Sequence, residues 1–324
     1  SQPYNAARSF ATLDHLSDGR TGWNAVTSSD PAAALNFGLD EHPDKSSRYR
    51  MAEEYLSVLK GLWDSWEDDA LVGDKESGVY TDNSKMHYLD HEGEFFKVKG
   101  PLNITRSPQG YPVFFQAGAS PQGSAFAGRT AEAVLAAQQT REGARAFREK
   151  MCDATEAAGR PRDAVKIMCG IAPIIGDTRE EALEKLADLG RLTDPVAAIR
   201  LLSERTGHDM SQFPIDEPVP DLPVSETGMQ GHATQLLDLA KRENMTVRQL
   251  RDFASFSSGH RVVFGTAEEV ADDLQSWFES GVTDGFVVMA PWLPTPIEDF
   301  CRKVVPILAE RGLFRSEYEG ATLR

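Results

Sequence analysis

Residues 8–28 read Arg-Ser-Phe-Ala-Thr-Leu-Asp-His-Leu-Ser-Asp-Gly-Arg-Thr-Gly-Trp-Asn-Ala-Val-Thr-Ser. The apolar side chains at positions 10, 11, 13 and 16 share one side of an expected helix, which ends at Asp18-Gly19. An apolar strand over residues 21–27 follows directly, and Asn24, Thr27 and Ser28 lie toward its end. Barrels of parallel strands build their sites from polar residues at the C-terminal ends of strands, so this stretch predicts half of such a repeat.

Four more apolar runs of strand length follow, at residues 112–118, 132–137, 165–175 and 285–290. Their hydrophobicity is continuous, which indicates strands covered on both faces, as in a parallel sheet. Amphipathic helical patterns separate these runs at residues 47–66, 141–158, 178–189, 266–281 and 296–312. The alternation predicts an α/β fold with right-handed crossovers. A closed barrel needs eight strands, and this count gives five.

Several helix ends carry recognisable signals. Thr178 and Thr266 each stand three positions before a glutamate, which is the spacing of a capping box at a helix start. The sequence Gly-Arg-Pro at residues 159–161 is a clear stop signal for the helix before it. These signals support the helix boundaries that the apolar periodicity predicts.

Two stretches depart from the alternation within a single domain expected over residues 1–324. Residues 68–109 are polar with scattered aromatic side chains, and we expect an excursion outside the main sheet. Residues 190–260 read as mostly helical around a proline-rich middle at 214–223. Because a strand and a helix of the same kind follow residue 260, we interpret this second stretch as an insertion rather than an interdomain linker.

Composition limits the classes of partner. The 324 residues include 34 basic and 50 acidic side chains, a net charge of −16, which argues against nucleic acid and anionic membrane surfaces as partners. The three cysteines are sparse and do not form a disulfide framework; Cys169 lies in an apolar run and is expected to be a buried free thiol. No apolar run approaches the length of a membrane span, and a cytoplasmic location is expected.

The strongest local candidate for a binding site after the opening stretch is residues 116–124, Gln-Ala-Gly-Ala-Ser-Pro-Gln-Gly-Ser. Gly118 and Gly123 permit close approach of a ligand to the backbone, and Ser120 and Ser124 offer hydroxyls. Free N–H groups and a partial positive charge at a helix start make a plausible phosphate site. The alternative, favoured on these residues alone, is an ordinary strand-to-helix turn with Ser120 as N-cap and a proline at the first helical position.

Other polar residues have weaker signals. Asn24 could face a ligand or close a turn, and Tyr49 could reach a ligand or pack locally. His87 and His91 have the spacing of a metal pair on a helix, but the segment reads as loop or strand and no metal site is predicted. His260 could line a pocket, although a position in a surface loop is the expected one.

The chain resembles the flavin-dependent monooxygenases of the bacterial-luciferase-like superfamily. It resembles in particular the subfamily of the nitrilotriacetate, EDTA, dibenzothiophene-sulfone and long-chain alkane monooxygenases. The motifs that carry the resemblance span almost the whole chain and lie at residues 10–20, 23–28, 36–39, 48–49, 53–56, 62–66, 87–93, 100–102, 106–110, 116–121, 265–271, 284–286, 305–308, 311–312 and 318–324.

The resemblance implies an eight-stranded β/α barrel with inserted segments. By the motifs, the five strands counted here would be the fourth to the eighth. The first three strand-helix units would then precede this chain, and a short tail would follow Arg324. A barrel that lacked those units would have an open edge.

The resemblance also implies a flavin mononucleotide (FMN) site at the C-terminal ends of the strands. Asn24 would contact the flavin ring or its ribityl chain. Tyr49, Ser120 and the backbone from Gly118 through Gly123 to Ser124 would hold the phosphate, and this outweighs the preference for an ordinary turn. Some relatives have histidine where this chain has Ser28, so no catalytic role is assigned to that position or to any other.

The implied reaction is two-component monooxygenation. A separate NAD(P)H-dependent flavin reductase supplies reduced FMN, which reacts with O2 to form a peroxyflavin that oxygenates a small organic substrate, in some cases with C–N or C–S cleavage. A homodimer or homotetramer is expected. Two alternatives stay open: a non-catalytic flavin-binding protein on the same scaffold, and a flavin-independent hydrolase or lyase.

Overall fold

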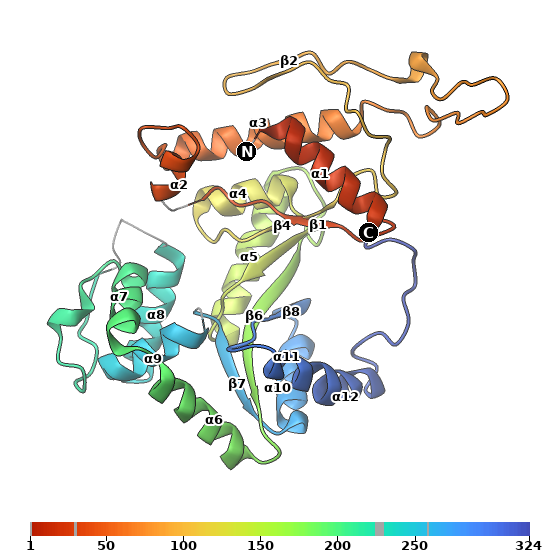
Figure 1. The fold of residues 1–324 in the computed structure, drawn as a ribbon. Helices are drawn as coiled ribbons and strands as arrows, with labels where there is room; N and C mark the ends of the chain where they lie inside the picture. Colours follow the sequence, from red (N-terminus) through yellow and green to blue (C-terminus); the bar gives the residue numbers. More distant parts are fainter. Residues whose placement is uncertain (1, 29–30, 224–229, 258) are drawn as a thin grey trace. The chain divides into compact units, whose positions relative to one another are not determined.

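The computed structural model describes residues 2–28, 31–223, 230–257 and 259–324. The chain is organised as two units, each with its own packing (Figure 1). The first unit comprises Ser1–Ala117, Thr130–Glu132 and Tyr318–Arg324, and the second comprises Gly118–Arg129 and Ala133–Glu317.

The first unit is built on two packed helices and one pair of parallel strands. Helix α1 (Pro3–Leu16) packs on α3 (Lys45–Trp63), where the indole of Trp63 donates to the carbonyl of Ala7 at 3.0 Å. Strand β1 (Gly22–Asn24) runs parallel to β4 (Val113–Gln116), and the short helix α2 (Pro31–Asn36) lies between β1 and α3 in the sequence.

The opening stretch forms the predicted helix and strand, but the strand is shorter than the expected 21–27. The residue Asn24 is the last of β1, and the chain turns at Ser28, which has a positive φ of 44°. The start of the strand is fixed by the fully buried Asp14, whose carboxylate accepts from the amide of Thr21 at 3.4 Å and from the backbone and side chain of Gln109 at 3.1 and 2.6 Å. A buried carboxylate with three donors thus defines where β1 begins.

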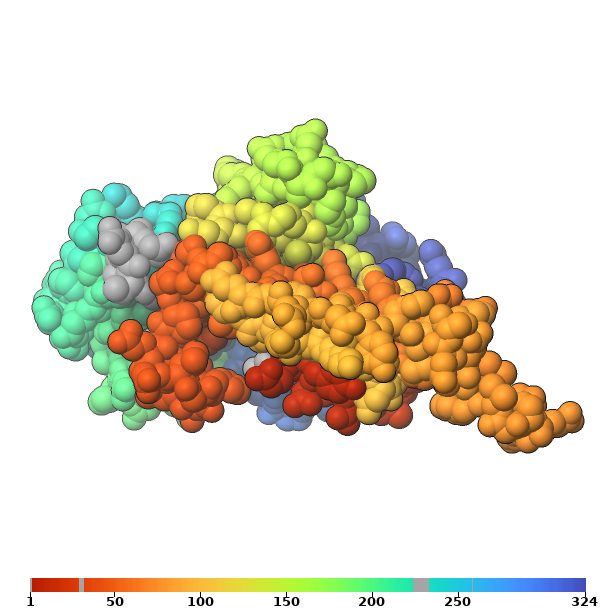
Figure 2. All heavy atoms as spheres, turned by 90° about the horizontal axis from the view of Figure 1, so that it is seen from above, coloured from red at the N-terminus to blue at the C-terminus, as the bar shows by residue number. Residues whose placement is uncertain are grey.

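Residues 68–109 contain little regular structure. A 3-10 turn, η1 (Asn83–Lys85), is followed by β2 (His91–Glu92) and β3 (Lys97–Val98), which pair antiparallel in a sheet of their own. The orange spheres of Figure 2 show part of this segment extending away from α1 and α3 of the same unit. Glu54 on α3 holds the β2–β3 turn, because its carboxylate accepts from His91 and from the amides of Phe95 and Phe96, each at 2.9 Å.

The second unit carries four parallel strands. Strand β6 (Lys166–Ile175) pairs with β5 (Ala133–Ala136), β7 (Arg261–Gly265) and β8 (Gly285–Val288). One face of β6 and β7 is covered by α10 (Ala267–Glu279) in a core that includes Ile171, Val263 and Leu274. The helices that precede and follow β5 are α4 (Pro121–Thr130) and α5 (Arg141–Ala157).

The remaining helices of this unit follow in chain order. Between β6 and β7 lie α6 (Arg179–Leu192), α7 (Pro195–Thr206), the 3-10 turn η2 (Met210–Gln212), α8 (Gln230–Arg242) and α9 (Val247–Ser257). Helices α7, α8 and α9 share a small core of their own. After β8, α11 (Thr295–Asp299), the π-helical turn η3 (Phe300–Val304) and α12 (Val305–Glu310) form the helix predicted at 296–312.

Thr178 and Thr266 are the N-caps of α6 and α10, so the helix starts predicted at these two residues are confirmed. Thr178 accepts the amide of Glu181, and Thr266 makes the full capping box before α10, with its hydroxyl accepting from Glu269 and the Glu269 carboxylate accepting the amide of Thr266. Both satisfy amides that a helix start leaves without partners.

The count of five strands is wrong. Within the described residues six strands run parallel to a neighbour. The one left out of the count is β7. It begins with Arg261, whose guanidinium lies 4.1 Å from the ring centroid of Trp277 and 2.7 Å from Asp273, both on α10. The assignment of five strands as the fourth to the eighth of a barrel therefore no longer fits the count.

Residues 318–324 belong to the first unit, although the chain reaches them from the second. The amide of Leu323 donates to the carbonyl of Gly19 at 2.8 Å, that of Arg324 donates to the side chain of Gln109 at 3.1 Å, and the Arg324 guanidinium lies 2.9 Å from Glu132. These contacts tie residues that lie near opposite ends of the given sequence into one body.

The cysteines and the apolar character of the helices were both considered from the sequence. Cys152, Cys169 and Cys301 are all free thiols, and Cys169 is buried as predicted. Burial raises the pKa of its thiol, which keeps it in the neutral form. No helix among the described residues has both the length and the apolar character that crossing a bilayer requires.

Candidate active site

The turn between β4 and α4 has the geometry of a helix start that is open to an anion. The hydroxyl of Ser120 accepts from the amide of Gly123 at 3.2 Å, and a proline occupies the first helical position, so the N-cap predicted for Ser120 is confirmed. Within the described residues, the backbone N–H groups of Ser120 and Gln122 donate to no protein acceptor. Such N–H groups at a helix start are suited to anionic oxygens.

Ser124 supplies an independent indication of a ligand. It is 2 % exposed, and its hydroxyl is a buried polar atom for which the described residues provide no hydrogen-bond partner. It stands four positions after Ser120, one turn into α4, and side chains on a helix tilt toward the N-terminus. A buried hydroxyl without a partner costs free energy, so a ligand oxygen at this helix start would satisfy a group that the protein leaves unsatisfied.

Asn24 and Tyr49 belong to the first unit, whereas Gly118, Ser120, Gly123 and Ser124 belong to the second. Asn24 ends β1 and is exposed, and Tyr49 lies in the second turn of α3 and is half-buried. Four of the six predicted site residues thus lie together at the start of α4. The other two, Asn24 and Tyr49, belong to the first unit.

Lys150, which the sequence analysis did not select, also reaches this turn. From the middle of α5 its ammonium donates to the carbonyl of Ala119 at 2.6 Å. The two residues are 31 positions apart, and the lysine lies on a helix with several other exposed charges. Nothing in the local sequence distinguishes it.

The histidines considered from sequence have other environments. His87 lies 2.8 Å from Glu67 and His91 lies 2.9 Å from Glu54, so each imidazole has its own carboxylate. Across the described residues no group of three or more potential metal ligands is found.

His260 lies in the loop between α9 and β7, as expected, but it is half-buried and its ring lies against β6. A Cβ on Gly170 would stand 2.0 Å from its Nδ1, so the imidazole occupies the space that a glycine leaves open. Side chains alternate along a strand, and Gly170 therefore faces away from the side on which Ile171 packs against α10.

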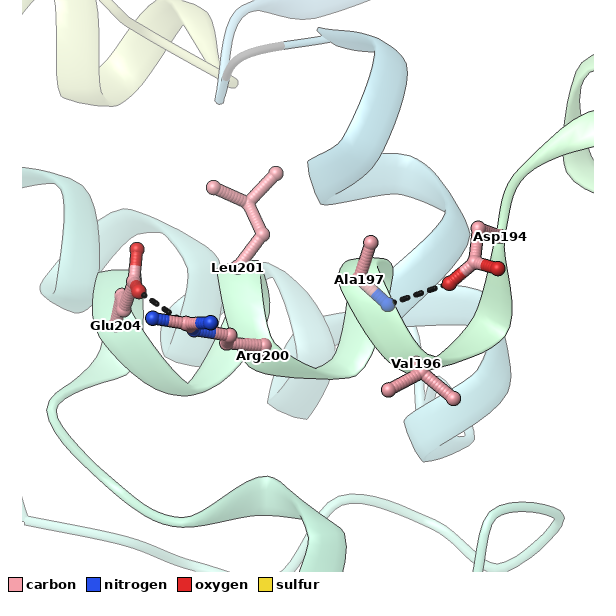
Figure 3. A pocket seen from close by; sticks show the side chains of 6 residues that line it. All are labelled: Asp194, Val196, Ala197, Arg200, Leu201 and Glu204. Carbon is pink, nitrogen blue, oxygen red and sulfur yellow. Dashed lines mark hydrogen bonds and ion pairs between the residues drawn. The ribbon is translucent and has the colours of Figure 1, made fainter.

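A surface pocket lies elsewhere, along α7, and contains none of the predicted site residues (Figure 3). Its polar groups are satisfied locally, because Asp194 caps α7 by accepting the amide of Ala197 at 2.7 Å and Arg200 pairs with Glu204 at 3.4 Å. Its polar side chains are therefore accounted for by helix capping and a surface ion pair, and we do not assign the pocket a function.

A family model described as luciferase-like monooxygenase matches residues 1–284 of this chain. The chain belongs to the luciferase-like monooxygenase family. N-acetyl-S-(2-succino)cysteine monooxygenase of Bacillus subtilis (strain 168) is 46 % identical to it over 326 residues, with 100 % of this chain and 74 % of that protein covered. Nitrilotriacetate monooxygenase component A of Aminobacter aminovorans is 44 % identical over 325 residues, with 100 % and 72 % covered.

Among solved structures, the riboflavin lyase RcaE with modified FMN and riboflavin superposes with a TM-score of 0.85 at 35 % identity, covering 100 % of this chain and 71 % of that one. This luciferase-like monooxygenase is accordingly a flavin-dependent oxidoreductase, which confirms the family and the class of activity that the motifs implied. The parallel α/β fold agrees with that membership. The number of strand-helix units outside this chain stays a prediction.

Proposed function

We propose that this chain is the oxygenase component of a two-component monooxygenase, which uses reduced FMN and O2 to oxygenate a small organic substrate. The observation that carries the proposal is the buried, unpartnered hydroxyl of Ser124 beside the open start of α4. The structure of the related riboflavin lyase with modified FMN supports FMN as the group bound there.

The residues at this turn suit a phosphate. The N–H groups of Ser120 and Gln122 and the hydroxyl of Ser124 are donors, and the positive end of the α4 dipole favours an anion. The hydroxyl of Ser120 already accepts from Gly123, so its oxygen keeps the first turn of α4 in place. When bound, reduced flavin supplies the electrons that activate O2.

The flavin contacts assigned to Asn24 and Tyr49 are part of the same proposal, and so are the supporting protein partners. A relative named as component A of its monooxygenase supports a separate component, which we infer to be an NAD(P)H-dependent flavin reductase. A homodimer or homotetramer remains an expectation. No residue is assigned as acid or base.

The substrate class is proposed at the level of small organic molecules that carry a heteroatom. The relatives at 46 % and 44 % identity are named for a succinated cysteine and for nitrilotriacetate, which contain a thioether sulfur and a tertiary amine nitrogen. Oxygenation of a carbon next to such an atom can lead to cleavage of the bond to that atom.

The test compares FMN with riboflavin, which lacks the phosphate. We expect Ser124→Ala to weaken FMN binding about 10- to 100-fold, the loss of a hydrogen bond to a charged group, and to leave the riboflavin Kd unchanged. The matched control is Ser255→Ala, because Ser255 lies on α9 with its hydroxyl already bonded to the Arg251 carbonyl at 2.8 Å. Equal loss of both ligands, or equal wild-type affinity for them, would contradict the phosphate site.

A second measurement tests catalysis. The purified protein is mixed with chemically reduced FMN, O2 and a panel of amines, thioethers and sulfones, and oxygenated products are identified by mass spectrometry. Product formation is expected. If FMN binds with the predicted preference and no substrate in the panel is ever oxygenated, the non-catalytic flavin-binding alternative replaces the oxygenase.

A further inference from the structure

The contact between Lys150 and the carbonyl of Ala119 is the starting point. The ammonium donates at 2.6 Å to a carbonyl that immediately precedes Ser120. The acids nearest to it on α5, Glu149 and Asp153, pair instead with Arg162. The hydrogen bond that Lys150 donates is therefore made to the turn at the start of α4.

The direction of that carbonyl fixes the direction of the next amide. The carbonyl of Ala119 and the N–H of Ser120 belong to one peptide group, and this peptide is not among the cis bonds of the structure, which are Gly100-Pro101 and Leu293-Pro294. In a trans peptide the C=O and N–H bonds point in opposite directions within one plane. By holding the carbonyl toward α5, Lys150 turns the Ser120 N–H away from α5.

The N–H of Ser120 makes no bond to a protein acceptor within the described residues, so its direction is not set by a partner of its own. Without the lysine, the 119–120 peptide can rotate and present its carbonyl, which would repel an anion at the same place. A contact that fixes this peptide in one orientation would therefore hold the N–H donor ready for the anion.

We propose that Lys150 is a positioning residue that orients the Ala119–Ser120 peptide so that its N–H, and not its carbonyl, faces the phosphate of the flavin. This inference rests on the proposed function and adds a residue on a different helix to the phosphate site. Lys150 acts through the peptide, and its own ammonium need not touch the phosphate.

The experiment measures Kd for FMN and for riboflavin, in low and high salt, with the wild type, Lys150→Met, Lys150→Arg and Lys166→Met. Lys166 is the matched control, because its ammonium also donates to a backbone carbonyl, that of Asp163 at 3.1 Å, at the opposite end of the strands. We expect Lys150→Met to weaken FMN about tenfold with riboflavin unchanged, and Lys150→Arg to restore much of the affinity because it keeps a donor. Lys166→Met is expected to match the wild type.

Salt separates orientation from simple attraction. At 1 M salt the Debye length is about 3 Å, so direct attraction between the Lys150 ammonium and a phosphate would be strongly screened. The orientation of a peptide group that is fixed by a hydrogen bond does not depend on that attraction. We expect the ratio of FMN affinities between wild type and Lys150→Met to persist at high salt. Collapse of the ratio toward one, or equal weakening of riboflavin, would overturn the positioning role.

The two proposals fail in different ways. If the wild type shows no preference for FMN over riboflavin, the phosphate site itself is refuted. If the wild type has that preference and Lys150→Met retains it in full, only the role of Lys150 is refuted.

Discussion

Replacing Glu54 with glutamine should release the β2–β3 turn from α3. The Glu54 carboxylate is 14 % exposed and accepts from the imidazole of His91 and from the amides of Phe95 and Phe96, each at 2.9 Å. Burial acts to raise the pKa of Glu54, but these hydrogen bonds outweigh it, and the net shift of the pKa is downward. The charged form is therefore the one that holds the turn.

Glutamine keeps one acceptor oxygen and places an N–H2 group against backbone donors. Loss of charge-assisted hydrogen bonds at a mostly buried group is expected to cost about 2 kcal/mol of local stability. That corresponds to roughly a 30-fold rise in the opening of the turn. The matched control is Glu94→Gln, because Glu94 lies on the same turn and pairs with Arg50 at 3.1 Å while both side chains are more than half exposed. An exposed pair contributes little.

Hydrogen exchange followed by mass spectrometry on peptides covering residues 91–98 measures the opening directly. At neutral pH the amides should exchange faster in Glu54→Gln and not in Glu94→Gln. A carboxylate whose folded pKa is depressed stabilises above its unfolded pKa and loses that effect as pH falls through the folded value. The difference between wild type and Glu54→Gln should therefore shrink as the pH falls through the lowered pKa of Glu54. Equal exchange at neutral pH would refute the reasoning.

Three further substitutions test packing and capping through urea denaturation. Gly170→Ala places a Cβ 2.0 Å from Nδ1 of His260 and should destabilise the second unit by about 1–3 kcal/mol; unchanged stability would show that the ring moves freely. Thr266→Ala removes the capping box of α10 and should cost about 1 kcal/mol, with Thr266→Ser recovering most of it. Arg148→Met breaks a bidentate pair with Asp284, both contacts at 2.9 Å, and should cost about 2 kcal/mol; no loss would mean that the pair is replaced by solvent without penalty.

Much of the fold follows from local pattern. The capping signal at Thr266 and the long apolar run at 165–175 carry their structural meaning within a few residues, and both formed where expected. Strand β7 was left out of the count although a strand was expected after residue 260. It begins with the charged residue Arg261, and the partners of that charge, Trp277 and Asp273 on α10, are distant in the sequence. Strand β1 ends at Asn24, three residues before the predicted end, although apolar character continues to Val26.

The candidate site divides in the same way. The residue types at the α4 start predict a cap at Ser120, and the structure confirms it. That the hydroxyl of Ser124 is buried without a partner depends on everything packed around it, and no spacing in the sequence expresses that. The contacts of Lys150 and His260 were missed for the same reason, since the residues that they contact, Ala119 and Gly170, are 31 and 90 positions away.

The return of residues 318–324 to the first unit has a consequence for synthesis on the ribosome. About 200 residues separate Ala117 from Tyr318, and at ~5–20 residues per second they take roughly 10–40 s to emerge. During that interval the carbonyl of Gly19 and the side chain of Gln109 lack the amides of Leu323 and Arg324. The residues of the second unit all lie in between and are synthesised first, so the unit that contains Ser1–Ala117 is the later of the two to be completed.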